Sequence, residues 1–291
     1  MPSCIDLHMH STASDGSDSP AKLLKAVEAA GIRTFALTDH DTVSGAVRLE
    51  RLLDAAGPDR PEFFRGIEFS CRSPVAKCHL LGYMYDFTCE QLQDALEEGR
   101  SLRRAKLNMR LDHLKEVHGI VFGDYELDWL YGLPSAGKPH ISNLLIRRGL
   151  AKTIQEAIRN FIDDGPKTKR RSDRIASSTA ISGILAADGI PVWAHPLGGE
   201  NEKHLTPEEF RVRLNVLLEE GIRGLECHYS RYTPEEVRFL RGEAERNGLF
   251  ISGGSDYHGQ NKDIPLGTLG TDSPALDESL LTILPELRAR L

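Results

Sequence analysis

The stretch Ser3-Cys4-Ile5-Asp6-Leu7-His8-Met9-His10 decides how the rest of the chain is interpreted. Asp6, His8 and His10 lie two residues apart, and on a β-strand such residues point to the same face. Two imidazoles and a carboxylate would then converge, and these groups are typical ligands of Zn, Mn and Fe. The alternative is a polar strand edge that faces solvent, so the motif needs support from elsewhere in the chain.

Further motifs supply that support, because each of them follows an apolar run with the character of a strand. They are Thr38-Asp39-His40-Asp41, Gly66-Ile67-Glu68, Cys78-His79, Ala194-His195-Pro196 and Gly254-Ser255-Asp256-Tyr257-His258. Barrels of alternating strands and helices place their chemistry at the carboxyl ends of the strands. We therefore expect one shared site built from His8, His10, Asp15, His40, Glu68, His79, His195, Asp256 and His258.

This set of candidate ligands is larger than one metal ion needs. It predicts at least two metals, about 3.5–4 Å apart, with a ligand shared between them. Glu68 is a natural bridge because its carboxylate has two oxygens. Imidazole and carboxylate without thiolate fit Mn, Fe or Zn and do not separate these metals.

The order of predicted elements indicates an α/β fold with a parallel sheet. Strands are expected near residues 5–8, 34–38, 62–70 and 79–83, with helices over 20–30 and 44–56. After a mainly helical stretch, strands are expected again at 190–194, 224–227 and 249–252, and a closing helix over 276–291. This alternation predicts helices packed outside a sheet of parallel strands.

Residues 89–177 differ from the remainder in pattern and in charge. Helices are expected near 90–117, 126–131, 140–148 and 154–162, followed by a loop over 165–174. Between Arg100 and Arg174 there are 16 Lys and Arg against 9 Asp and Glu, although the whole chain has a net charge of −7. We expect a small helical insertion on a barrel formed by residues 1–88 and 178–291. Its cations would either be solvated or face an anion over the metals.

The composition is that of an ordinary globular protein, 40% hydrophobic and 27% charged. We see no signal peptide and no apolar run long enough to span a membrane. Five cysteines without paired spacing favour a reducing compartment, so we expect a cytoplasmic protein that does not bind membranes. The acidic balance argues against an extended nucleic-acid surface.

Taken in order from residue 6 to residue 258, the motifs resemble those of the polymerase and histidinol phosphatase (PHP) family. Asp-Leu-His-Met-His, Thr-Asp-His-Asp, Gly-Ile-Glu, Cys-His-Leu-Leu-Gly-Tyr, Ala-His-Pro and Gly-Ser-Asp-Tyr-His carry the resemblance. It implies a distorted barrel of seven parallel strands and a phosphoesterase site with two or three metals, expected to be manganese.

The resemblance also divides the ligands among the metals. It assigns the first metal to His8, His10, Glu68 and Asp256, the second to Glu68, His79 and His195, and the third to Asp15, His40 and His258. Many family members have a histidine at the position of Asp15. Because of this difference, two roles stay open for Asp15: it ligates a third metal, or it only orients His40. Asp256, His195 and His258 are the candidates for proton transfer near the leaving oxygen.

Within the family, Gly137-Lys138-Pro139-His140 resembles a Gly-Arg-Pro-His-like motif of a short-chain subgroup with a helical insertion. This subgroup includes phosphatases of nucleoside 3′,5′-bisphosphates and related 5′-to-3′ exoribonucleases. It implies removal of the 3′-phosphate to give the 5′-mononucleotide, with short RNA 5′ ends as an alternative substrate. Lys138 in place of arginine loses bidentate geometry but keeps a positive charge for phosphate.

If one phosphate of such a substrate lies on the metals, the second phosphate needs cations of its own. Arg104 and Asn108 are four residues apart and share a helix face, whereas Arg103 points elsewhere. We expect Arg104 and Asn108, with Lys138 and His140 at a helix start, to bind this phosphate.

Three other functions stay open. A phosphatase for a small monoester such as histidinol phosphate would not need a large basic insertion. An amidohydrolase acting on a C–N bond also uses His-x-His after its first strand, but no metal-bridging lysine is evident here. A non-catalytic metal-binding or RNA-binding protein would not need the complete set of ligands.

Overall fold

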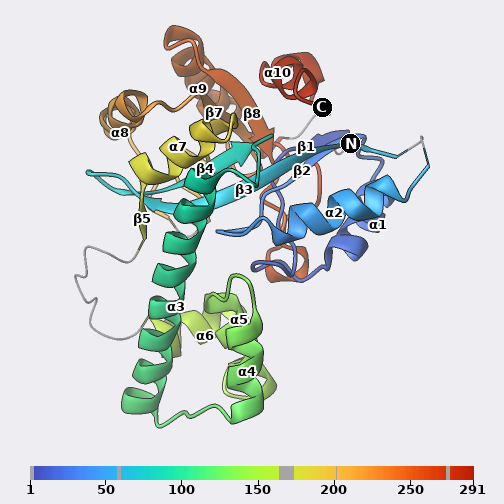
Figure 1. Cartoon of the computed structure of the whole chain (residues 1–291). Coiled ribbons are helices and arrows are strands. Elements are labelled where there is room, and N and C mark those ends of the chain that lie inside the picture. The colour runs from blue at the N-terminus through green and yellow to red at the C-terminus, as the bar shows by residue number, and fades with distance from the viewer. Residues whose placement is uncertain (1–2, 58–59, 164–173, 201, 273–275) are drawn as a thin grey trace.

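A curved sheet forms the centre of the molecule in a computed structural model that describes residues 3–57, 60–163, 174–200, 202–272 and 276–291. Its main strands follow the order β1-β2-β3-β4-β6-β7-β8 (Figure 1). Their bounds are β1 (Ile5–Asp6), β2 (Thr34–Leu37), β3 (Glu62–Arg72), β4 (Lys77–Tyr83), β6 (Ile190–Trp193), β7 (Gly224–Tyr229) and β8 (Phe250–Gly254).

The first and last strands of this row meet and nearly close a barrel. The Leu7 N–H donates to the Gly253 oxygen at 3.2 Å, and the Asp256 N–H donates to the His8 oxygen at 2.8 Å. A short further strand, β5 (Ile175–Ala176), pairs with β3 beside the barrel. The predicted fold class, a distorted seven-stranded α/β barrel, is confirmed.

One strand departs from the predicted parallel arrangement. β4 is antiparallel to both β3 and β6, and Cys71 of β3 faces Cys78 of β4. The reason is the tight turn from Ser73 to Ala76, which is too short for the crossover that parallel strands need. Because β4 runs backwards, His79 near its beginning lies at the same end of the barrel as the carboxyl ends of the parallel strands.

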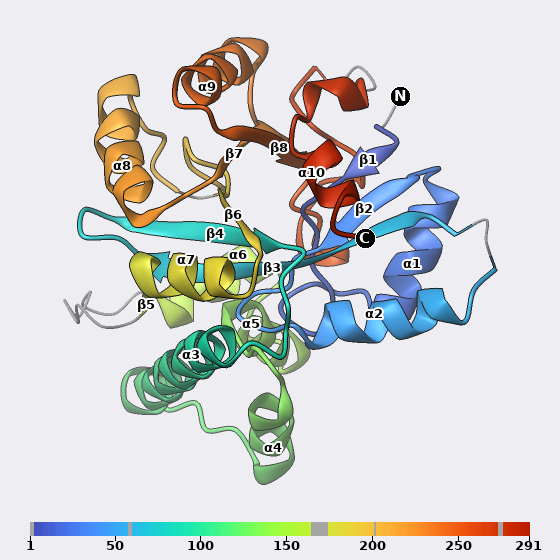
Figure 2. The same ribbon diagram turned by 45° about the horizontal axis from the view of Figure 1, so that its top comes forward.

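Helices surround the barrel (Figure 2). Two of them, α8 and α9, begin with capping boxes, in which Thr206 and Thr233 exchange hydrogen bonds with Glu209 and Glu236. The bounds are α1 (Pro20–Ala29), α2 (Ser44–Asp54), α7 (Ser177–Ala186), α8 (Pro207–Glu220), α9 (Pro234–Arg246) and α10 (Leu284–Arg288).

The closing helix predicted over 276–291 is wrong in its extent. The structure has a 3-10 turn, η3 (Glu278–Leu280), and then the short helix α10. Pro285 stands in the first turn of α10, where its missing N–H does no harm, whereas deeper in a helix it would remove a hydrogen bond.

A helical segment extends from the end of the barrel that carries the predicted ligands (Figure 1). Early residues of α3 such as Leu96 pack in the barrel core, whereas Leu107 and Leu114 belong to a separate core with Leu145. One continuous helix therefore joins the two cores. The segment comprises α3 (Glu90–His118), α4 (Asp124–Gly132), α5 (Lys138–Arg147), α6 (Ile154–Ala157) and the π-helical turn η1 (Ile158–Ile162).

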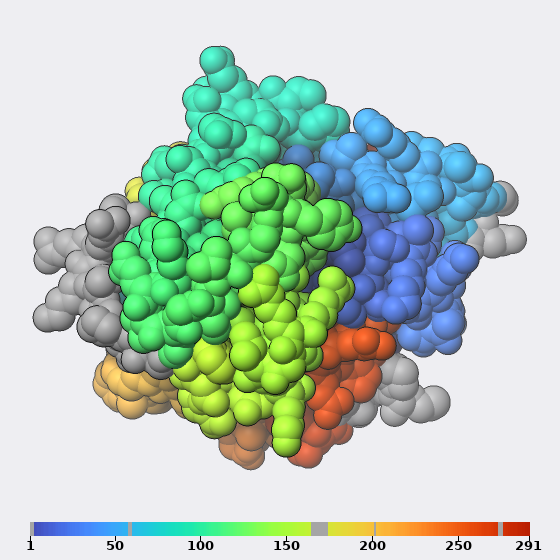
Figure 3. Space-filling model, turned by 90° about the horizontal axis from the view of Figure 1, so that it is seen from below, coloured from blue at the N-terminus to red at the C-terminus, as the bar shows by residue number. Residues whose placement is uncertain are grey.

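Seen from that end, the insertion covers the centre of the face, with N-terminal residues in blue and C-terminal residues in orange-red beside it (Figure 3). Most of the loop predicted over 165–174 lies outside the described residues. Among the helices that are described, none has both the length and the apolar character to cross a membrane.

Candidate metal centre

The nine predicted ligands come together at one end of the barrel. Their possible ligand atoms form three groups, each within 4.8 Å: His8, His10, Glu68 and Asp256; His40, Glu68 and His79; and His10, Asp15, His40 and His258. His195 joins the second group, since its Nε2 lies 3.2 Å from Glu68 Oε1. The geometry suits several metals, and the assignment of each ligand to a metal stays a prediction.

Glu68 lies at the centre of the cluster. Its Oε2 is 3.3 Å from His8 Nε2 and 3.1 Å from His10 Nε2. Its Oε1 is 2.8 Å from His79 Nδ1 and 3.2 Å from His195 Nε2. A carboxylate whose two oxygens face two different pairs of histidines suits a ligand shared by two metals.

Buried polar atoms without hydrogen bonds support the metal-binding interpretation. Among the described residues, the buried His79 Nε2 has no hydrogen-bond partner, and the buried His40 Nδ1 and Glu68 Oε2 contact other groups of the cluster, 3.1 Å from each other. Leaving such groups unpaired is costly, and a bound cation would satisfy them. The donors are imidazoles and carboxylates without thiolate, which fit Mn, Fe or Zn.

The charges of the cluster shift the pKa values of its members. Burial would raise the pKa of Glu68, but the surrounding histidines hold it well below its usual value. Burial lowers the pKa of His40 to about 3, so this imidazole is neutral and free to bind a metal. Burial would also lower the pKa of His10, but hydrogen bonds with Asp256 and Glu68 raise it to about 9. A metal must therefore displace a proton from His10.

Asp6 does not join the cluster, although its position in the opening motif predicted that it would. Its Oδ2 accepts hydrogen bonds from the Ser255 hydroxyl at 2.5 Å and the Gly267 N–H at 2.8 Å. It therefore ties the first strand to the loop after β8, two residues before His8 enters the cluster.

Glu226, in the middle of β7, was not predicted and is fully buried. Its Oε1 lies 2.9 Å from His8 Nδ1, and its Oε2 accepts the His195 N–H at 2.7 Å. These contacts leave His8 Nε2 facing the cluster, as is usual for a histidine that binds a metal. Its place between Leu225 and Cys227 on a buried strand was the sequence signal for a supporting role, but that signal did not reveal which ligand Glu226 contacts.

Asp256 divides its two oxygens between the cluster and its support. Oδ1 lies 3.3 Å from His10 Nε2 and 3.6 Å from His8 Nε2. Oδ2 accepts hydrogen bonds from Lys262 Nζ at 2.6 Å and from the Tyr229 hydroxyl at 3.0 Å. Lys262 is a second residue that sequence reasoning missed, since a lysine in a loop carries no recognisable pattern.

Asp15 faces three histidines of the cluster. Its Oδ1 lies 3.2 Å from His258 Nε2 and 3.7 Å from His10 Nδ1, and its Oδ2 lies 3.9 Å from His40 Nε2. Burial would raise its pKa, but His40 and His258 hold it well below the usual value. An ionised carboxylate at this point is suited to a third metal, and equally to orienting His40.

In the insertion, Arg103 contacts a residue that lies beside a member of the cluster in sequence. Its Nε donates to Oδ2 of Asp41 at 2.9 Å, and Asp41 directly follows the predicted ligand His40 in the sequence. Arg104 instead lies over Tyr131, 4.7 Å from the ring centroid, and donates to the Tyr131 backbone oxygen at 2.9 Å. Asn108 accepts a hydrogen bond from the same tyrosine hydroxyl.

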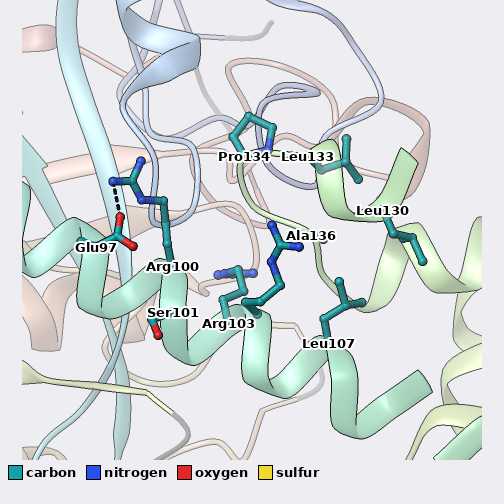
Figure 4. Close-up of a pocket in the computed structure, with 10 residues that line it drawn as sticks. Glu97, Arg100, Ser101, Arg103, Leu107, Leu130, Leu133, Pro134 and Ala136 are labelled. Atoms are coloured by element: carbon teal, nitrogen blue, oxygen red, sulfur yellow. Dashed lines mark hydrogen bonds and ion pairs between the residues drawn. The ribbon is translucent and has the colours of Figure 1, made fainter. Parts of the chain in front are cut away.

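Arg103 and Arg104 line one cavity of about 440 Å³ between α3 and the α4–α5 region (Figure 4). Leu130 and Leu133 lie across it from α3. A cavity with cations on one side and apolar groups on another suits a ligand that has both an anionic group and an apolar surface.

Lys138 and His140 at the start of α5 already have partners. Lys138 forms an ion pair with Asp163. His140 Nδ1 accepts the Gly137 N–H at 3.0 Å, and its ring also hydrogen-bonds the Ser14 backbone, next to Asp15. Burial lowers the pKa of His140. The start of α5 thus lies against the loop that carries Asp15.

Comparisons with known proteins agree on one family. The model of the PHP domain matches residues 6–165. A 5′-3′ exoribonuclease of Haemophilus influenzae is 28% identical over 253 residues, covering 87% of this chain and 89% of the relative. A 3′,5′-nucleoside bisphosphate phosphatase of Chromobacterium violaceum is 27% identical over 274 residues, covering 90% of this chain and 92% of the relative.

A solved structure shares the fold. It is described as a metal-dependent phosphoesterase of Bifidobacterium adolescentis, with a TM-score of 0.82 and 24% identity. The match covers 100% of this chain and 98% of that protein, so the similarity includes the insertion as well as the barrel.

Proposed function

This chain belongs to the PHP domain family, and from that premise we propose that it removes the 3′-phosphate of nucleoside 3′,5′-bisphosphates to give 5′-mononucleotides. The resemblance predicted from the motifs is confirmed, and the protein is a hydrolase of phosphate esters. Short RNA 5′ ends are the second candidate substrate, since one relative is an exoribonuclease and another a bisphosphate phosphatase.

One observation carries the proposal: the cluster and the cationic cavity are neighbours but separate. Arg103 lines the cavity and binds Asp41, which follows the predicted ligand His40. One phosphate would lie at the cluster while another lies in the cavity with Arg104. A nucleoside 3′,5′-bisphosphate has two phosphates on one ribose, so it satisfies both places. Asn108, Lys138 and His140 stay our further candidates for binding this second phosphate.

The residues of the cluster would hold the metals, which supply a Lewis acid that polarises the phosphoryl group. Lys262 and Tyr229 fix one oxygen of Asp256 so that the other faces the cluster. Asp256, His195 and His258 are the candidates for moving a proton to the leaving oxygen.

The test compares kcat/KM for a nucleoside 3′,5′-bisphosphate and a nucleoside 3′-monophosphate with Mn added. We predict a preference of roughly 10–100-fold for the bisphosphate, as expected from one charge-assisted contact worth about 1.5–3 kcal/mol. Arg104→Ala should remove most of this preference and leave slow hydrolysis of the monophosphate.

Arg147→Ala is the matched control, because Arg147 is an exposed arginine of the insertion outside the cavity. Equal kcat/KM values for the two substrates in the unmodified protein would show that the second phosphate is not bound. A small monoester such as histidinol phosphate would then become the better candidate substrate.

A further inference from the structure

A second basic cavity, of about 230 Å³, lies beside β4 and α8, and we call it the downstream cavity. Its cations are Lys77 at the start of β4, Lys203, and Arg213 of α8. It adjoins the metal cluster, because it shares three lining residues with a cavity of about 60 Å³ inside the cluster: His79, His195 and Glu202.

The positive charge of this region is only partly neutralised. Lys203 forms an ion pair with Glu209, and Arg213 interacts electrostatically with the same carboxylate. Nearby, Arg174 interacts electrostatically with Glu202. Its Nε and Nη1 are buried and have no hydrogen-bond partner among the described residues. The three cations of the cavity outnumber Glu202, the one carboxylate among the described residues that line it, so the cavity favours an anion.

The downstream cavity and the cavity of the insertion are linked through the β3–β4 pair, next to the cluster. Arg103, in the insertion cavity, donates to Ser70 Oγ at 2.9 Å. Ser70 faces His79 across the β3–β4 pair, and His79 lines the downstream cavity. A chain that enters at the insertion and crosses the cluster would therefore continue into the downstream cavity.

We propose that the downstream cavity binds the phosphate that follows the scissile one in an oligonucleotide. This inference rests on the proposed function and extends its substrate class. A nucleoside bisphosphate has two phosphates and does not reach the cavity. A 5′-phosphorylated dinucleotide that also has a 3′-phosphate has three phosphates. The third, at its 3′ end, would bind Lys77 and Arg213.

The bonds balance as a hydrolysis. Water adds to the scissile phosphorus, and the bond from phosphorus to O3′ of the first nucleotide breaks. One proton of the water passes to O3′, which leaves as the hydroxyl of a 5′-mononucleotide. The downstream chain keeps the phosphorus as a new 5′-phosphate, so that its own next phosphate stays in the downstream cavity.

The test measures binding to the metal-loaded protein. The ligands have a methylene group in place of the scissile O3′, so that they are not hydrolysed. Three are compared: the nucleoside bisphosphate, the 5′-phosphorylated dinucleotide, and that dinucleotide with a 3′-phosphate. We expect the third phosphate to tighten binding about tenfold, the effect of one charge-assisted contact. The double variant Lys77→Ser/Arg213→Ser should lose this gain and bind the bisphosphate as before.

The control is Lys25→Ser/Arg238→Ser, which removes the same charge from exposed positions on α1 and α9. Equal binding of the two dinucleotides by the unmodified protein overturns the inference, and so does an equal loss for all three ligands in the Lys77/Arg213 variant. Hydrolysis of the natural bisphosphate is measured in parallel. If it fails while the third phosphate still tightens binding, the proposed function falls and the downstream cavity stands. If hydrolysis succeeds without that gain, only the downstream cavity falls.

Discussion

Glu226 supports two predicted ligands of the cluster through its two oxygens, one near His8 Nδ1 and one on the His195 N–H. Glu226→Gln keeps the size of the side chain but removes its charge. We predict that metal affinity falls by roughly 10–100-fold, the usual effect of losing a partner of a ligand. Metal retention against a chelator measures it. Glu236→Gln, which alters a capping glutamate of α9, should retain metal normally.

Asp15 gives a second prediction at the scale of single residues. Asp15→Asn keeps the shape but not the charge that faces His40 and His258. If a third metal binds there, the variant should lose that metal, keep the other two and lose most of its kcat. Metal content per chain and kcat are measured together. A metal-loaded crystal structure with Asp15 more than about 3 Å from any metal, against the usual 2.0–2.2 Å, would contradict ligation.

At the scale of helices and strands, local patterns predicted which elements exist better than how they are oriented. The sequence predicted a strand over residues 79–83, but the direction of this strand follows from its pairing with β3 and β6, which local patterns do not reveal. In the same way, helical spacing predicted that Arg103 and Arg104 point apart, whereas both of them line one cavity. It did not show that Asp41 would pair with one of them and Tyr131 with the other.

The supporting residues were hidden for a related reason. Glu226 contacts His8, which is distant from it in sequence. Lys262 contacts Asp256, which is near in sequence but at a spacing that no known motif marks. That the candidate ligands cluster was predictable, because metal chemistry restricts such ligands to a few residue types and most of these candidates lie beside a strand.

The separate core of the insertion gives a prediction at this scale. Leu114 of α3 is fully buried there, and Leu114→Ala should destabilise this core by about 2–5 kcal/mol through loss of contacts and a cavity. Trp129 lies in this core and Trp193 in the barrel, so fluorescence of a Trp193→Phe background follows the insertion during denaturation. Metal content should stay normal while the preference for bisphosphate declines. Loss of metal as well would show that the barrel depends on the insertion.

Over the whole molecule, the cluster joins parts of the chain that are far apart. His8 follows the first strand and Asp256 the last, and the two strands meet through few backbone hydrogen bonds. Side chains from both sides of this seam face Glu68 and His10. Metals bound there would therefore link the two ends of the barrel as well as prepare the site for phosphate.

This linkage predicts that metals stabilise the fold, and that the effect depends on pH. Ligands that bind only the folded state raise its stability, by about 2.7 kcal/mol at 100 times Kd. Because the pKa of His10 is raised to about 9, a proton occupies it at pH 6 and must be displaced by the metal. Raising the pH removes that competition. The rise in Tm on adding Mn should therefore grow from pH 6 to pH 9, when scanning calorimetry is run with and without metal. Glu68→Ala should show little response to metal at any pH, and a metal-dependent rise that stays constant over this range would contradict the competition at His10.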